Sequence, residues 1–163
     1  MSIRELTAEL SRVLESLKQL GACLEQETAE LSHINIEAMA RLNQQKEQIA
    51  TQLESGAPQV ARQLKEVAVG LGLPENSTLG AVAKALKAKG NLEILQLHEQ
   101  LNSVGENNRR LLALNREIAE NFSASVGNTL EILTRLINQS SFYGARGGYE
   151  KNRTGSVLIN REA

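Results

Sequence analysis

The chain has 163 residues, a formal net charge of −1 and 41% hydrophobic residues, which is the composition of an ordinary folded domain. Its acidic residues are all glutamate, which excludes an EF-hand calcium loop and any mechanism that needs a catalytic aspartate. The near-neutral charge also argues against a dedicated nucleic-acid-binding protein, because such proteins normally carry a strongly basic surface.

The first predicted helix spans about residues 3–31. Apolar residues recur along it in steps of three and four, and Glu27 is the one polar interruption of that stripe. Ser2 and Glu5 have the spacing of a capping box, in which each side chain bonds the backbone amide of the other residue. The pattern predicts an amphipathic helix long enough to pack along a second long helix.

Asn35 is a favourable N-cap for a second helix, in which Lys46 occupies a position where an apolar residue is expected. The segment Ser55–Pro58 predicts that this helix ends and a third begins, since proline is tolerated in the first helical turn. The third helix is expected to end before Pro74.

A short fourth helix is expected next, capped by Asn76-Ser77 and closed by Gly90. Residues 57–90 are thus predicted to be short helices between long helical arms. Short connections of this kind favour antiparallel neighbours.

The longest apolar repeat begins at Ile94 and ends at Leu136, with strict alternation of three- and four-residue steps over six heptads. It predicts one continuous helix. Four polar residues occupy seam positions of this repeat: Asn108, Asn115, Ser125 and Thr129. They either fix the register of the bundle, because a slipped alignment would leave them unpaired, or lie where the bundle opens and water enters.

Near its C-terminal end the long helix carries a second apolar stripe beside the first. With Ile132 and Leu136 it makes this part of the helix apolar over more than one face, which predicts a partner-binding surface or an oligomer contact. The stripe consists of Val126, Leu130, Leu133 and Ile137.

The residues after the long helix are rich in glycine and slightly basic, so residues 138–163 are predicted to form a flexible tail. Several of its side chains gain much from burial on a partner, which indicates an arm that orders on binding; the alternative is a terminus that packs back on its own bundle. These candidate partner-binding residues are Phe142, Tyr143, Arg146, Tyr149, Val157, Leu158 and Ile159.

The fold class that follows is all-α: an elongated antiparallel helical bundle, resembling a coiled coil, with three long helices, short helices in the middle and a flexible tail. Residues 1–137 are expected to form the bundle domain and residues 138–163 the tail. The polar seam allows either a monomer or a homodimer.

Residue patterns for chemistry are lacking, so no catalytic residue, cofactor or metal site is predicted. One Glu-x-x-His spacing, Glu30 to His33, lies at a helix end, and Cys23 has no cysteine partner. The first residues lack the apolar core of a signal peptide, and the longest apolar stretch is too short to span a membrane. A cytoplasmic protein that binds other proteins is therefore expected, without membrane insertion.

The chain resembles a known family, the bacterial flagellar export chaperones called FlgN. The resemblance covers nearly the whole chain and rests on the order of several motifs. These are the Leu-rich first helix, Leu42-x-x-x-Lys46-x-x-Ile49, Asn107-Asn108-Arg109-Arg110-Leu111-Leu112, and Tyr143-Gly144-Ala145-Arg146-Gly147 directly after the long helix.

The resemblance implies a chaperone without enzymatic activity that binds helical terminal segments of hook-associated proteins and prevents their premature assembly. It also implies that the client-binding part lies toward the C-terminus, and components of the export apparatus are further candidate partners. Two other functions are weighed against it: a coiled-coil adapter that self-associates, and an RNA-binding regulator that uses the Arg146-Gly147-Gly148 segment of the tail, although no nucleic-acid partner is expected.

Overall fold

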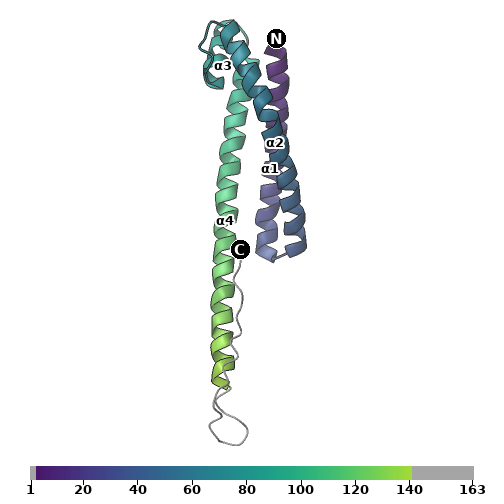
Figure 1. Cartoon of the computed structure of the whole chain (residues 1–163), viewed down its shortest axis with the longest axis vertical. Helices are drawn as coiled ribbons and strands as arrows, with labels where there is room; N and C mark the ends of the chain where they lie inside the picture. The colour runs from purple at the N-terminus through teal and green to yellow at the C-terminus, as the bar shows by residue number, and fades with distance from the viewer. Residues whose placement is uncertain (1–2, 141–163) are drawn as a thin grey trace, which may run out of the picture. The chain divides into compact units, whose positions relative to one another are not determined.

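The computed structural model describes residues 3–140, with side chains through Ile137, and the regular structure of these residues is entirely helical. The elements are α1 (Ile3–His33), α2 (Ile36–Gly70), α3 (Leu79–Ala88) and α4 (Glu93–Ser140) (Figure 1). The predicted all-α class with three long helices is confirmed. Contacts divide the chain into two units, Met1–Ala119 and Glu120–Ala163, and α4 contributes to both.

The first unit has an aliphatic core at the end where α1 begins, where all of its helices meet (Figure 1). Phe122, the one aromatic residue among the described side chains, is not part of this core. Each buried leucine, isoleucine or valine contributes about 1.5–3 kcal/mol relative to an exposed position. The buried cluster consists of Leu6, Leu10, Leu14, Val67, Ala68, Val82, Ala83, Leu86, Ile94 and Leu97.

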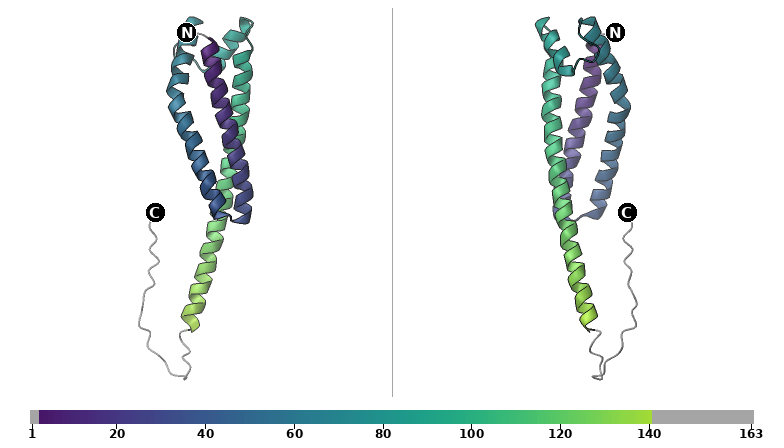
Figure 2. Two further views of the ribbon diagram at one scale, coloured as in Figure 1. Left: turned by 90° about the vertical axis from the view of Figure 1, so that its right-hand side faces the viewer. Right: turned by 60° about the vertical axis from the view of Figure 1, so that its left-hand side comes forward.

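The three long helices lie side by side in the first unit (Figure 2). Helices α1 and α2 form an antiparallel hairpin joined by Ile34 and Asn35. Helix α4 runs parallel to α1, because Asn108 bonds the carbonyl of Leu17 and Asn115 that of Leu24, both at an offset of 91 residues. This offset is a whole number of heptads, so the heptad seam of α4 keeps the same face toward α1.

The predicted break at Ser55–Pro58 is wrong, because α2 continues through it to Gly70. Proline inside a helix removes one backbone hydrogen bond and crowds the preceding turn. The helix continues because apolar residues on both sides of Pro58, Ile49 before it and Val67 after it, are buried in the first unit. Residues 57–70 therefore belong to a long helix, and α3 is the one short helix in the described part of residues 57–90.

The predicted helix ends are partly confirmed. The side chain of Asn35 caps α2 by accepting a hydrogen bond from the amide of Ala38 at 3.1 Å. Gly90 follows α3 with φ +87°, a conformation that favours glycine. The cap of α3 is Thr78 instead of Asn76-Ser77, because its hydroxyl accepts from the amide of Ala81 at 3.3 Å. Ser2, and with it the capping box, lies outside the described residues.

Candidate partner-binding surface

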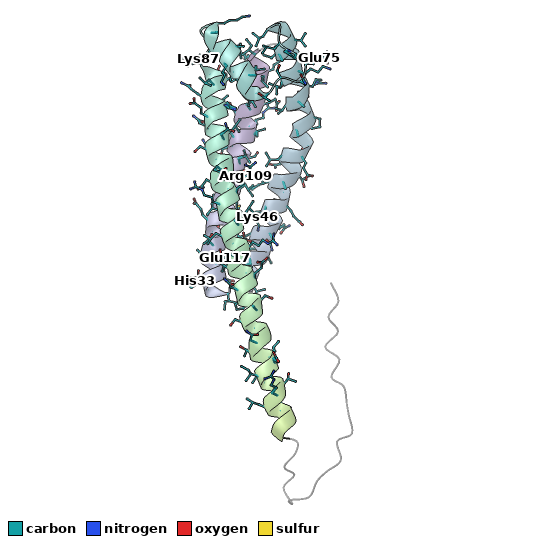
Figure 3. All side chains as sticks on the ribbon, turned by 90° about the vertical axis from the view of Figure 1, so that its left-hand side faces the viewer. His33, Lys46, Glu75, Lys87, Arg109 and Glu117 are labelled. Carbon is teal, nitrogen blue, oxygen red and sulfur yellow. The ribbon has the colours of Figure 1, made fainter. Side chains whose placement is uncertain are left out.

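A polar cluster joins α1, α2 and α4 in the first unit. Asn115 of α4 is 5% exposed and donates to the carbonyl of Leu24 at 2.9 Å and to Glu27 Oε2 at 2.8 Å. Its own oxygen accepts from the hydroxyl of Thr28 at 2.6 Å. Lys46 of α2, labelled in Figure 3, completes the cluster with an ion pair to Glu27 Oε1 at 2.5 Å. A buried network whose members are all bonded specifies one arrangement of three helices.

Asn108 makes a second polar contact one heptad earlier in α4. It is 4% exposed and donates to the carbonyl of Leu17 at 2.8 Å. Gly21 of α1 allows this close approach, since a Cβ there would lie 2.7 Å from Asn108 Oδ1. Both seam asparagines are therefore buried register residues, whereas Ser125 and Thr129 are exposed to water. The interpretation as register-fixing residues therefore holds for Asn108 and Asn115, and the interpretation as residues reached by water holds for Ser125 and Thr129.

The seam of α4 continues beyond the first unit into the second. Every described side chain from residue 119 to residue 137 is exposed.

One side of α4 in the second unit is a broad apolar surface, which we call the C-terminal face. At 100° per residue its members span an arc of about 160° around the helix. Their exposed fractions range from 41% for Val126 to 67% for Ile137. The opposite side is polar and includes an ion pair between Arg135 and Glu131 at 2.5 Å. The C-terminal face comprises Phe122, Val126, Leu130, Ile132, Leu133, Leu136 and Ile137.

Four of the predicted partner-binding residues, Val126, Leu130, Leu133 and Ile137, are on the C-terminal face. Ile132 and Leu136, which the sequence places beside this stripe, are also on the face, and the structure adds Phe122. Phe122, Ile132 and Leu136 are at seam positions of the heptad repeat, and the structure shows that their side chains are exposed. The remaining predicted residues, Phe142, Tyr143, Arg146, Tyr149, Val157, Leu158 and Ile159, lie outside the described residues.

Other reactive side chains are bonded locally. His33 bonds the carbonyl of Ala29 at 2.9 Å, and His98 bonds Asn102 at 3.2 Å. Cys23 forms no disulfide with a described residue, and its Sγ donates to Gln45 Oε1 at 3.7 Å. Within residues 3–140 no three His, Cys, Asp or Glu side chains are grouped so that they could hold a metal ion. None of the described helices combines the length and the hydropathy needed to cross a bilayer.

An all-helical fold that leaves a broad apolar helix face exposed is typical of proteins that bind helical segments of other proteins. The sequence comparison names the family within this class: the chain belongs to the FlgN family, because the family model described as FlgN protein matches residues 1–151. FlgN proteins are chaperones of flagellar export. Comparisons with curated proteins and with solved structures found no match.

Proposed function

We propose that this flagellar export chaperone binds hook-associated proteins, the subunits of the hook–filament junction, and holds them unassembled in the cytoplasm before export. The observation that carries the proposal is the C-terminal face, an arc of about 160° of apolar side chains on an exposed helix. Axial subunits that polymerise through amphipathic helices present a matching apolar stripe. A client helix docked on this face has its own assembly surface covered.

The apolar residues of the face are numerous enough for specific binding. Burying the exposed half of a leucine or isoleucine side chain contributes about 1–2 kcal/mol, and the face has seven apolar residues. Part of this gain is offset by the translational and rotational freedom that two associating molecules lose. The affinity is therefore moderate, which suits a chaperone that must release its client at the export apparatus.

The tail is proposed to close over the docked client helix. Phe142, Tyr143 and Tyr149 supply aromatic area, Val157, Leu158 and Ile159 supply an aliphatic cluster, and Arg146 supplies a cation for the client's polar side. Ordering this segment opposes binding and keeps the affinity moderate. Components of the export apparatus are further candidate partners, because a chaperone of this kind must deliver its client there.

The first test compares client capture by the full chain and by two variants. Val126→Asn with Leu133→Asn changes the C-terminal face, and deletion of residues 138–163 removes the tail. We expect each to weaken the binding of hook-associated proteins at least tenfold, since about 1.4 kcal/mol of lost binding free energy suffices for that. Isothermal titration or a pull-down with quantified clients measures it.

The matched control is Leu112→Asn with Leu114→Asn, which changes two exposed leucines of α4 outside the C-terminal face. Client affinity should stay within twofold of that of the unchanged chain. A face variant that binds as tightly as this control contradicts the assignment of the surface. A client set without hook-associated proteins contradicts the assignment of the clients.

A self-associating coiled-coil adapter is the second candidate function, because the exposed seam of α4 has the heptad spacing of a coiled coil. In an adapter of this kind, deletion of residues 138–163 leaves the assembly intact. The RNA-binding alternative depends on tail residues outside the described part of the chain, and strong salt-dependent RNA binding would favour it.

A further inference from the structure

The exposed side of α3 carries a positive charge that no nearby carboxylate in the sequence offsets. Lys84, Lys87 and Lys89 are all exposed, and residues 76–92 contain no acidic residue. Within the part of the chain that the structure describes, none of the three lysines forms an ion pair. The whole chain has a net charge of −1, so this segment is positive on a protein that is slightly negative.

Cations elsewhere in the first unit are placed beside carboxylates. Arg12 and Arg41 each pair with a glutamate three or four residues away on the same helix. Glu75, the acidic residue that precedes α3, is bound by Lys65 of α2, with Nζ and Oε2 2.5 Å apart. Figure 3 shows Glu75 and Lys87 on opposite sides of this end of the first unit. Helix α3 therefore departs from the charge pairing of its neighbours.

The packing of α3 directs its lysines to solvent. Its large apolar side chains are buried in the core, and Lys84 and Lys87 lie about 60° apart around the opposite side of the helix. Exposed Ala81 and Ala88 lie beside them and leave the ammonium groups accessible. Lys87 in the last turn complements the helix dipole, but that role needs one cation and not three. Lysines three residues apart repel each other.

We propose that the exposed side of α3 is a docking surface for an acidic helical segment of another protein. Carboxylates three or four residues apart on such a segment have the same spacing as Lys84 and Lys87, about 5–6 Å. Binding replaces repulsion between lysines by attraction, so an acidic partner is favoured over a neutral one. The surface belongs to the first unit and shares no residue with the C-terminal face, so the proposal does not depend on the proposed function.

Two other anionic partners fit this surface less well. A membrane would be held by the lysines alone, because the exposed side of α3 has no large apolar side chain to insert between lipids. Single-stranded nucleic acid is normally bound by a basic surface with aromatic side chains on which bases stack, and α3 has no aromatic residue. An acidic protein segment requires neither feature.

The test measures the affinity of the full-length chain for a labelled, alanine-based helical peptide with glutamates three and four residues apart, by fluorescence anisotropy. Lys84→Glu with Lys87→Glu is expected to weaken binding about tenfold at low salt, because two attractions become repulsions. Lys84→Gln with Lys87→Gln removes the charges without reversing them and should weaken binding about threefold. Raising the ionic strength from about 0.01 to 0.1 M shortens the screening length from about 30 to 10 Å and should reduce these differences.

The matched control is Lys18→Glu with Arg110→Glu, two exposed cations of α1 and α4 that have no ion pair among the described residues. It changes the net charge by the same amount as the α3 reversal, and the peptide affinity should stay within about twofold of that of the unchanged chain. Circular dichroism checks that every variant is folded. A loss in the control equal to that in the α3 variant would mean that net charge alone attracts the peptide, and would overturn the proposal.

The same variants are titrated with vesicles containing about 30% anionic phospholipid and with single-stranded RNA. Tighter binding of either one than of the peptide, lost in the α3 variant and kept in the control, would assign the surface to that ligand and refute an acidic protein partner. Absence of peptide binding up to about 1 mM refutes it as well. None of these measurements contains a client, so failure here leaves the proposed function standing.

Discussion

At the scale of single residues, Gly21 shows how one missing side chain fixes the distance between two helices. Glycine inside a helix normally costs about 1 kcal/mol relative to alanine. In α1 a glycine is nevertheless favoured at position 21, because Asn108 of α4 occupies the space that a Cβ would fill. The amide of Asn108 is held there by its bond to the carbonyl of Leu17, so it cannot move away without losing that bond.

Gly21→Ala is expected to lower the free energy of unfolding by about 1 kcal/mol, because the new Cβ displaces a buried amide. The matched control is Gly105→Ala in α4, where a Cβ meets nothing within 4 Å, and it should raise the free energy of unfolding by about 0.5–1 kcal/mol. Urea unfolding followed by circular dichroism measures both. In an Asn108→Ala background Gly21→Ala should become stabilising; a cost that persists there would mean that another contact is responsible.

The polar cluster shows which residue contacts can be predicted from the sequence and which cannot. Glu27 and Lys46 each stand out as the polar interruption of an apolar stripe, on two different helices. They pair because of the way α1 and α2 are aligned in the hairpin. Sequence periodicity alone does not fix this alignment, since a shift by one helical turn keeps the same faces together. The partner amide of Asn115 comes from 88 residues away, and no local rule connects positions at that separation.

At the scale of elements, α2 contains the clearest conflict between local propensity and packing. Pro58 is exposed, and the carbonyl of Glu54, four residues earlier, receives no amide from it. Pro58→Ala restores that donor and is expected to raise the free energy of unfolding by about 1–3 kcal/mol. Thermal and urea unfolding measure the change. Pro74→Ala, in the loop before α3, is the control and should give no gain; equal effects would show that Pro58 costs α2 nothing.

Most elements follow from periodicity and caps, and the exceptions have physical reasons. The extent of α1 and the cap at Asn35 are local properties, so the sequence predicts them. The continuity of α2 is a tertiary property, because burial of Ile49 and Val67 outweighs the cost of Pro58. Most residues of the C-terminal face are visible in the sequence as apolar stripes, whereas the exposure of their side chains depends on tertiary packing and is seen only in the structure.

At the scale of the whole molecule, the two units should differ in local stability along one continuous helix. Ile94 and Leu97 of α4 are buried in the core of the first unit, whereas residues 120–137 bury no side chain. Amide hydrogen exchange is therefore expected to be at least a hundredfold slower for residues 97–111 than for residues 120–137, since protection follows local burial. Mass spectrometry of exchanged peptides measures it, and equal protection in both segments would contradict the division into two units.

The separation of the core from the C-terminal face has an evolutionary consequence. Substitutions on the face remove no buried contact, so they leave the stability of the first unit nearly unchanged. A protein whose binding residues are not also its folding residues can change binding specificity without losing its fold. On the proposed function, client specificity can therefore change by substitutions on the C-terminal face while the core of the first unit stays the same.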